Sequence, residues 1–139
     1  MAKYAYGTDV AVTSSKAEIE KTLTRFGADQ FMIGWQTDKA LLAFRAHGRH
    51  IRMVLPLPQQ KDFSTVPKYE AEARRVWRSM ALCIKAKVES VATGIETFED
   101  SFMAHVVLPN GETMAEYSRP LIAAAYETGS MPKLLPHLQ

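Results

Sequence analysis

Two histidines and three arginines gather between residues 45 and 52 of the chain, and they are His47, His50, Arg45, Arg49 and Arg52. The His-x-x-His spacing offers two imidazoles to a zinc ion, but zinc needs further ligands and no cysteine or carboxylate stands at ligand spacing. We therefore expect no metal site here. Guanidinium groups bind phosphate and carboxylate oxygens in pairs of hydrogen bonds. The cluster predicts a basic patch with an anionic partner.

A second basic group follows at Arg74, Arg78 and Lys85, with Arg75 beside it. The first three residues are spaced i, i+4, i+11, which places them along one side of a helix. A basic strand face and a basic helix face together predict a nucleic-acid site that contacts the phosphate backbone. Base stacking would fall to Tyr4, Tyr6 and Phe63, because we expect Phe31 and Trp35 in the core.

The sequence shows no catalytic motif. It lacks G-x-S-x-G, Walker and G-x-G-x-x-G elements. Cys83 falls on the predicted buried stripe of a helix, which is an inert position for a thiol. The acids Glu96, Glu99 and Asp100 precede or open a helix, where they complement its dipole. We expect a non-enzymatic protein without a cofactor, and an undetected hydrolase or metal enzyme is the alternative.

Alternating apolar residues predict a hairpin of strands 40–47 and 50–55, joined by a type II′ turn at Gly48-Arg49. That register sets His47 opposite His50, and Arg45 opposite Arg52. With a strand at 30–36 the hairpin forms a three-stranded antiparallel meander. One face is apolar, and its residues are Leu42, Phe44, Ala46, Ile51, Met53 and Leu55.

Helices are predicted at 15–26, from a Ser15-x-x-Glu18 capping box, and at 67–92, across the apolar face of the meander. A short edge strand is expected at 8–13. The C-terminal third is predicted to be helical, with starts at Thr97 and Thr113 and with Pro120 kinking or splitting the last helix. The tail 130–139 is expected to be extended, over the body or on a neighbouring subunit. The fold class is α+β in a single domain, 1–139.

The distribution of charge leaves two interpretations open. Residues 1–66 and 67–95 each have a net charge of +3, whereas residues 96–139 carry −4, within a total of +2. The strand arginines would bind an external phosphate, or they would pair with the acidic third at Glu96, Glu99, Asp100 or Glu112. The lone cysteine fits a reducing cytosol. No apolar run suits a leader or a membrane span, so we expect a cytoplasmic protein.

Five segments of the chain form a distinctive set: Phe26-Gly-Ala-Asp-Gln-Phe-Met-Ile-Gly-Trp35, Gly48-Arg-x-Ile-Arg-x-x-Leu-Pro-Leu-Pro58, Trp77-Arg-x-x-x-Leu-x-Ile-Lys-Ala-Lys87, Thr97-Phe-Glu-x-x-Phe-x-Ala-His105 and Leu108-Pro-x-Gly111. In these segments the chain resembles a widespread family of small phage and prophage proteins. The resemblance implies a phage origin and the cytoplasm of an infected bacterium, and it implies no reaction. The order of strands and long helix is also similar to the β-β-β-α unit of phage single-strand annealing proteins.

These observations predict a phage accessory protein that binds nucleic acid, single-stranded DNA among the candidates, through Arg45, His47, Arg49, His50, Arg52, Arg74, Arg75, Arg78 and Lys85. The alternative is a protein–protein interaction module that inhibits a host defence system or a host enzyme, in the manner of an anti-CRISPR protein. It would use the acidic region 96–116 or the apolar tail, and the tail would also serve homo-oligomer formation.

Overall fold

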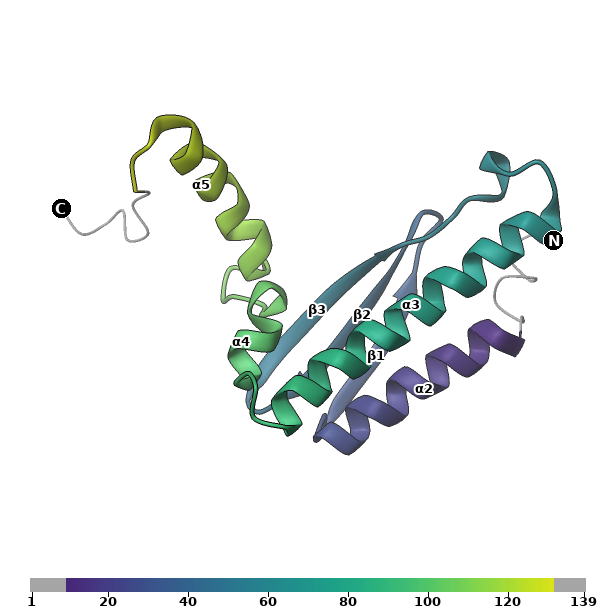
Figure 1. The fold of residues 1–139 in the computed structure, drawn as a ribbon, viewed down its shortest axis with the longest axis horizontal. Helices are drawn as coiled ribbons and strands as arrows, with labels where there is room; N and C mark the ends of the chain where they lie inside the picture. The colour runs from purple at the N-terminus through teal and green to yellow at the C-terminus, as the bar shows by residue number, and fades with distance from the viewer. Residues whose placement is uncertain (1–9, 132–139) are drawn as a thin grey trace.

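The computed structural model describes residues 10–131 of the chain. It confirms the predicted α+β class: a three-stranded antiparallel sheet in the order β1-β2-β3 is combined with helices that precede and follow it (Figure 1). The elements are α2 (Val10–Phe26), β1 (Gln30–Trp35), β2 (Lys39–Ala46), β3 (Arg49–Pro56), η1 (Gln60–Asp62), α3 (Val66–Ala92), α4 (Phe98–Phe102), η2 (Met103–His105) and α5 (Met114–Thr128).

Helix α2 is longer than the capping box predicts. Val12, Ser15, Ile19 and Leu23 are its buried residues, and they follow one face of the helix from the first turn onward. The edge strand expected at 8–13 is wrong for residues 10–13, which are helical, while Thr8 and Asp9 lie outside the described range. Ser15 is a buried helical residue and does not begin the helix.

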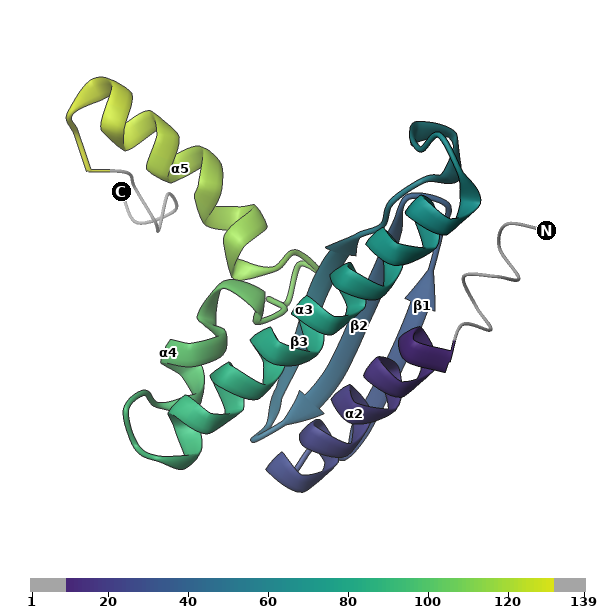
Figure 2. The ribbon, with the colours of Figure 1, turned by 45° about the vertical axis from the view of Figure 1, so that its right-hand side comes forward.

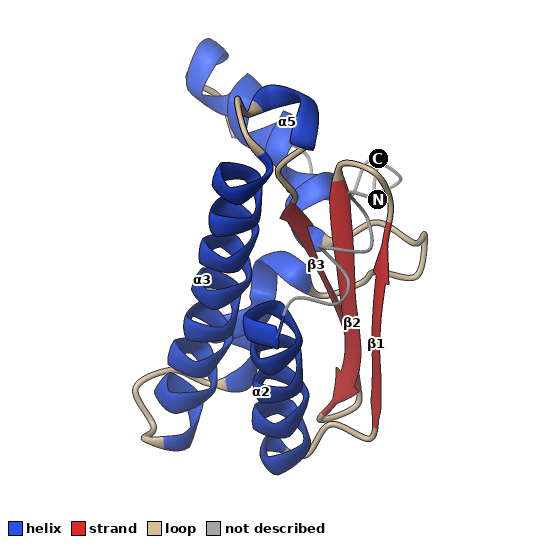
Figure 3. Cartoon of the chain, turned by 90° about the vertical axis from the view of Figure 1, so that its right-hand side faces the viewer, coloured by secondary structure: helices blue, strands red, loops and turns tan. Residues whose placement is uncertain are grey.

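Helices α2 and α3 lie side by side on one face of the sheet, and neither covers the other face (Figure 3). The long helix therefore covers the meander as predicted, and α2 shares that task. The fully buried side chains come from all three components, and they include Ile19 and Leu23 of α2, Leu42 and Ile51 of the sheet, and Trp77 and Ile84 of α3. This shared core fixes the two helices relative to each other.

Only a narrow stripe of α3 is buried, because α2 covers part of the sheet. The buried residues are Tyr69, Ala73, Trp77, Met80, Ala81 and Ile84. The expectation that Cys83 lies in the core is wrong: its side chain is exposed, as is that of its neighbour Leu82. Trp35, also expected in the core, is 53% exposed at the end of the edge strand β1.

Short helix α4 closes one end of the sheet–helix body. Phe98 and Phe102 are its buried aromatic residues, and the Phe102 ring meets Phe44 edge to face at 5.6 Å between centroids. Lys87, which interrupts the apolar stripe of α3, donates a hydrogen bond to the carbonyl of Ser101 at 2.9 Å. The Ser101 hydroxyl donates in return to the carbonyl of Lys87 at 3.1 Å, so the two helices are joined reciprocally.

Helix α5 extends away from the body of the molecule (Figures 1 and 2). Thr113 and Glu116 form a capping box at its start, which agrees with the predicted start. Pro120 was expected to kink or to split this helix, and the split is wrong, because one helix continues from Met114 to Thr128 with Pro120 inside it. None of its fifteen residues is buried.

The predicted extended tail falls on residues 130–139, of which 132–139 lie outside the described range. No helix within residues 10–131 combines the length and the apolar character needed to cross a membrane.

Candidate nucleic-acid interface

The β2–β3 turn consists of His47 and Gly48, one residue earlier than predicted. Both residues have positive φ angles, 53° and 75°, which is the signature of a type I′ turn. The register therefore pairs Arg45 with His50, and Arg52 with Ala43. The predicted Arg45–Arg52 and His47–His50 pairs are wrong, and the structure avoids that opposition of like charges. Each residue of β3 faces a β2 residue two positions earlier than predicted. Because a shift of two residues keeps every side chain on the same face, the predicted apolar face is unchanged.

Arg45 lies on the uncovered face of the sheet and pairs with Asp29, just before β1. Its Nε donates to Asp29 Oδ1 at 3.0 Å, and its Nη2 makes a second hydrogen bond to Oδ2. The hydrogen-bonded guanidinium lowers the pKa of Asp29 below its ordinary value. A bidentate pair of this kind satisfies both partners, although both remain partly exposed.

Arg49 and Arg52 reach acids in the C-terminal third. Arg49 Nη2 lies 3.0 Å from Glu99 Oε2 of α4. Arg52 Nη2 lies 2.9 Å from Glu116 Oε1 of α5 and 2.9 Å from the carbonyl oxygen of Gly111. Of the four acids expected as counter-charges, only Glu99 pairs with a strand arginine. The side chain of Glu112 accepts a hydrogen bond from Asn110, and that of Glu96 accepts one from Ser90.

The two histidines are not neighbours on one face. His47 lies in the turn, where its ring centroid is 4.8 Å from that of Phe98 and 5.1 Å from that of Phe26. His50 is exposed on the uncovered face opposite Arg45. The expectation that His47 belongs to the basic strand face is therefore wrong. Within residues 10–131 no three His, Cys, Asp or Glu side chains come together in a metal-binding arrangement.

The helix arginines line a hollow between α2 and α3. This hollow has a volume of about 430 Å³, and its polar walls are Arg74, Arg75 and Arg78 of α3 with Ser14 and Ser15 of α2. All three arginines are exposed. Arg75 pairs with Glu72 through Nε at 2.8 Å, whereas Arg78 makes no ion pair with any residue of 10–131. Arginine and hydroxyl donors around one hollow suit the oxygens of a phosphate.

A second hollow lies further along the two helices. It has a volume of about 370 Å³, and it is lined by Arg25 of α2 and Lys85 of α3, together with the acid Glu89. Lys16 of α2 lines neither hollow. Its Nζ lies 4.9 Å from the centroid of the Trp77 ring, and burial lowers the pKa of this amine. The two hollows between α2 and α3 each carry basic side chains, and we call the line that joins them the basic helix groove.

The structure brings together Arg74, Arg75 and Arg78 as predicted, with Lys85 further along the same groove. Sequence reasoning missed the α2 side of the groove, Ser14, Ser15 and Arg25, since no periodicity indicates which helix lies beside which. Tyr4 and Tyr6 lie outside the described residues. Phe63 is half-buried, with its ring centroid 6.0 Å from that of Tyr69. Searches for similar protein-family models, curated proteins and solved structures found no match.

Proposed function

We propose that the protein is a non-enzymatic nucleic-acid-binding protein whose phosphate contacts lie in the basic helix groove. The observation that carries the proposal is the hollow lined by three exposed arginines and two serines. Single-stranded DNA or RNA is the expected ligand class, because a groove that follows a flexible backbone needs no complementary duplex shape. The proposed setting, a phage-infected bacterial cytoplasm, rests only on the sequence resemblance to small phage proteins.

The charge arrangement favours the helix groove over the strand face. Arg45, Arg49 and Arg52 already have carboxylate partners, so an external phosphate would compete with Asp29, Glu99 and Glu116. Arg78 and Lys85, by contrast, have no ion-pair partner within residues 10–131, although Glu89 lies on the same helix. Unpaired cations release counter-ions on binding, which is the main source of affinity for a phosphate backbone.

The length of the groove fits a short stretch of backbone. Arg74 and Lys85 are separated by eleven residues of one helix, and at a rise of 1.5 Å per residue this is about 16 Å. Known single-strand-binding folds contact about four or more nucleotides per site. The serines and arginines at one end and Arg25 with Lys85 at the other would contact phosphates a few nucleotides apart on the same strand.

The test is binding of fluorescently labelled single- and double-stranded oligonucleotides as a function of salt. For a single strand, the logarithm of affinity falls with the logarithm of salt concentration by about 0.7 per phosphate contact. Replacing both Arg74 and Arg78 by alanine should therefore flatten that slope by about 1.4. A charge-matched control, Lys39→Ala with Lys61→Ala, should leave the slope unchanged.

A second pair distinguishes the groove from the strand face. Under the proposal, Arg45→Ala with Arg52→Ala leaves the salt slope unaltered, because those guanidinium groups hold internal carboxylates. A flattened slope in that variant, with no effect at Arg74 and Arg78, would move the site to the sheet. Absence of binding at low salt to every oligonucleotide would exclude the nucleic-acid function.

The second candidate function is a protein–protein module that inhibits a host defence system or a host enzyme. The acidic surface expected for it is largely engaged, because Glu99 and Glu116 pair with strand arginines. The observation that favours it is the apolar exposure of α5, where Ile122 is 54% and Tyr126 is 88% exposed. Affinity capture from host lysate tests this candidate, with an Ile122→Glu variant as the matched bait.

A further inference from the structure

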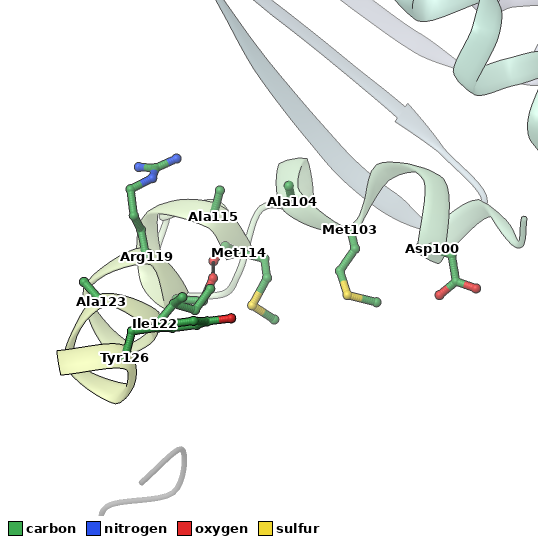
Figure 4. A pocket seen from close by; sticks show the side chains of 10 residues that line it. Asp100, Met103, Ala104, Met114, Ala115, Arg119, Ile122, Ala123 and Tyr126 are labelled. Carbon is green, nitrogen blue, oxygen red and sulfur yellow. Dashed lines mark hydrogen bonds between the residues drawn. The ribbon is translucent and has the colours of Figure 1, made fainter. Parts of the chain in front are cut away.

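An apolar groove separates α5 from α4 and η2 (Figure 4). It has a volume of about 810 Å³, and the side chains that matter for its chemistry are Met103, Ala104, Met114, Ile122, Ala123 and Tyr126. Asp100 lies at the α4 end and Arg119 belongs to the α5 half. The groove involves neither α2 nor α3, so it shares no residue with the basic helix groove.

Within residues 10–131, helix α5 makes too few contacts to explain its apolar face. Met114, Ser118, Ile122 and Tyr126 recur at every fourth residue and form one stripe along the groove. Isolated helices of about this length are marginal in water, and most helices in proteins are held by burial of such a stripe. No residue of α5 is buried, and Met103 on the opposite wall is 48% exposed. Both walls of the groove therefore leave apolar surface uncovered within residues 10–131.

We propose that the occupant is a second copy of this chain, and that the groove is the interface of a two-fold symmetric homodimer. In a two-fold interface the same patch serves both subunits, and each end of the patch meets the opposite end of its mate. Figure 4 shows the α5 half, with Ile122 and Tyr126, at one end and the α4 half, with Met103 and Asp100, at the other. Two-fold pairing therefore sets α5 of each copy against α4 and η2 of the other.

Charge complementarity supports a second copy over an unrelated partner. The groove carries one cation, Arg119, in its α5 half and one anion, Asp100, at its α4 end. Neither side chain makes an ion pair with any residue of 10–131. Two-fold pairing sets the α5 end of each copy against the α4 end of the other. It therefore brings Arg119 of each copy toward Asp100 of the other, which forms two equivalent ion pairs in the dimer. The small residues Ala104, Ala115 and Ala123 leave room for the large Met, Ile and Tyr side chains of the mate.

The experiment is sedimentation equilibrium of the full chain over a range of concentrations. Wild-type protein should dimerise, and Ile122→Glu should raise the dissociation constant by about tenfold or more, because it places an unpaired charge in the interface. Ile122 is already 54% exposed, so the monomer should keep its fold and its far-ultraviolet circular dichroism. The matched control is Ile95→Glu, which changes a residue that is 80% exposed outside the groove. This control should dimerise like the wild type.

Charge exchange tests the arrangement itself. Arg119→Asp alone and Asp100→Arg alone should each weaken the dimer, and the double variant should restore it. A wild-type chain that stays monomeric, a dimer unaffected by Ile122→Glu, or a double variant as weak as the single ones would overturn the proposal. Loss of the dimer on truncation after Met131 would assign the contact to the tail 132–139 and would overturn it as well.

Discussion

Arg52 and Glu116 join the sheet to the last helix. Arg52 Nη2 lies 2.9 Å from Glu116 Oε1, and the same oxygen accepts a hydrogen bond from the Thr113 N–H at 2.8 Å. One carboxylate therefore does two tasks: it completes the capping box of α5, and it holds β3 against the loop before that helix. The hydrogen bond from Thr113 and the pairing with Arg52 lower the pKa of Glu116. The basic strand face and the acidic C-terminal third neutralise each other at this point.

The two tasks of Glu116 can be separated by substitution. Thr113→Ala removes the cap and should destabilise α5 by about 1 kcal/mol. Glu116→Gln keeps an acceptor for the Thr113 N–H and should change α5 much less. Hydrogen exchange of the amides of residues 114–118 is the measurement, and faster exchange is expected in Thr113→Ala alone. Equal acceleration in both variants would show that the ion pair with Arg52 holds the helix start as strongly as the cap does, and it would contradict the expected difference.

The carboxylate pairs predict a loss of stability in acid. Folded-state pKa values of Asp29 and Glu116 lie below their ordinary values of 3.8 and 4.5. Carboxyl groups with lowered pKa values stabilise the fold fully above the unfolded values, and that contribution disappears as pH falls through the folded ones. Urea unfolding at successive pH values should show the loss beginning near pH 4.5. In the variant Asp29→Asn the decline should be shallower, and an unchanged decline would exclude the Asp29–Arg45 pair as a contributor.

His105 predicts a separate effect at higher pH. Burial lowers the pKa of this imidazole below its ordinary value of 6.5, and the nearby Lys87 ammonium lowers it further. The unfolded chain therefore binds the proton more readily, so stability should decrease as pH falls below 6.5 and stop decreasing below the folded pKa. Titration of the His105 ring by nuclear magnetic resonance measures the shift directly. A pKa at or above 6.5 in the folded protein would contradict the prediction.

Cys83 provides a test of how α3 faces the solvent. Because its thiol is exposed in the folded chain, a thiol reagent should modify it at the rate expected for a model peptide, without prior unfolding. Since it is the only cysteine in the chain, the reaction has one product. Protection by a factor of a hundred or more would place the residue in the core, as the apolar stripe indicates, or in an interface.

The faces of the elements could be predicted from the sequence, but not the contacts between distant segments. Alternation identified Leu42, Phe44, Ile51 and Met53 as the buried face, because period-2 patterning survives an even register shift. For the same reason, alternation cannot distinguish two β2–β3 registers that differ by two residues. For α3, the pattern could not tell Trp77 and Ile84, which are buried, from Cys83 on the adjacent stripe, because the place of α2 on the sheet was unknown.

The ion pairs of the candidate site were beyond sequence reasoning for a similar reason. Asp29 and Arg45 are 16 residues apart, and Glu116 and Arg52 are 64 residues apart. Charge totals left open whether the strand arginines bind an external phosphate or pair with the acidic third, and Glu99 was a named candidate for the second interpretation. The partner of Arg52 was missed because it depends on the path from β3 through Gly111 to the start of α5. Because these pairs occupy Arg45, Arg49 and Arg52, the proposal places the phosphate contacts in the basic helix groove.

The β2–β3 turn gives a prediction that distinguishes the two registers. In the observed type I′ turn both His47 and Gly48 have positive φ, whereas the type II′ turn at Gly48-Arg49 would need it only at Gly48. A β-branched residue is poorly tolerated at positive φ, where an L-residue already costs roughly 1–2 kcal/mol. His47→Val should therefore destabilise the fold, through backbone strain and through the lost ring contacts with Phe26 and Phe98.

Two further variants isolate the backbone effect from the packing effect. Gly48→Ala should cost about 1–2 kcal/mol from strain alone, because a Cβ at Gly48 would meet no atom within 4 Å. His50→Val is the control on a regular, exposed strand position, where valine is well tolerated. The measurement is the urea midpoint of unfolding for each variant, which reports the change in the free energy of unfolding when the m-value is unchanged. If His47→Val proved as stable as His50→Val, residue 47 would be a strand residue and the turn would lie at Gly48-Arg49.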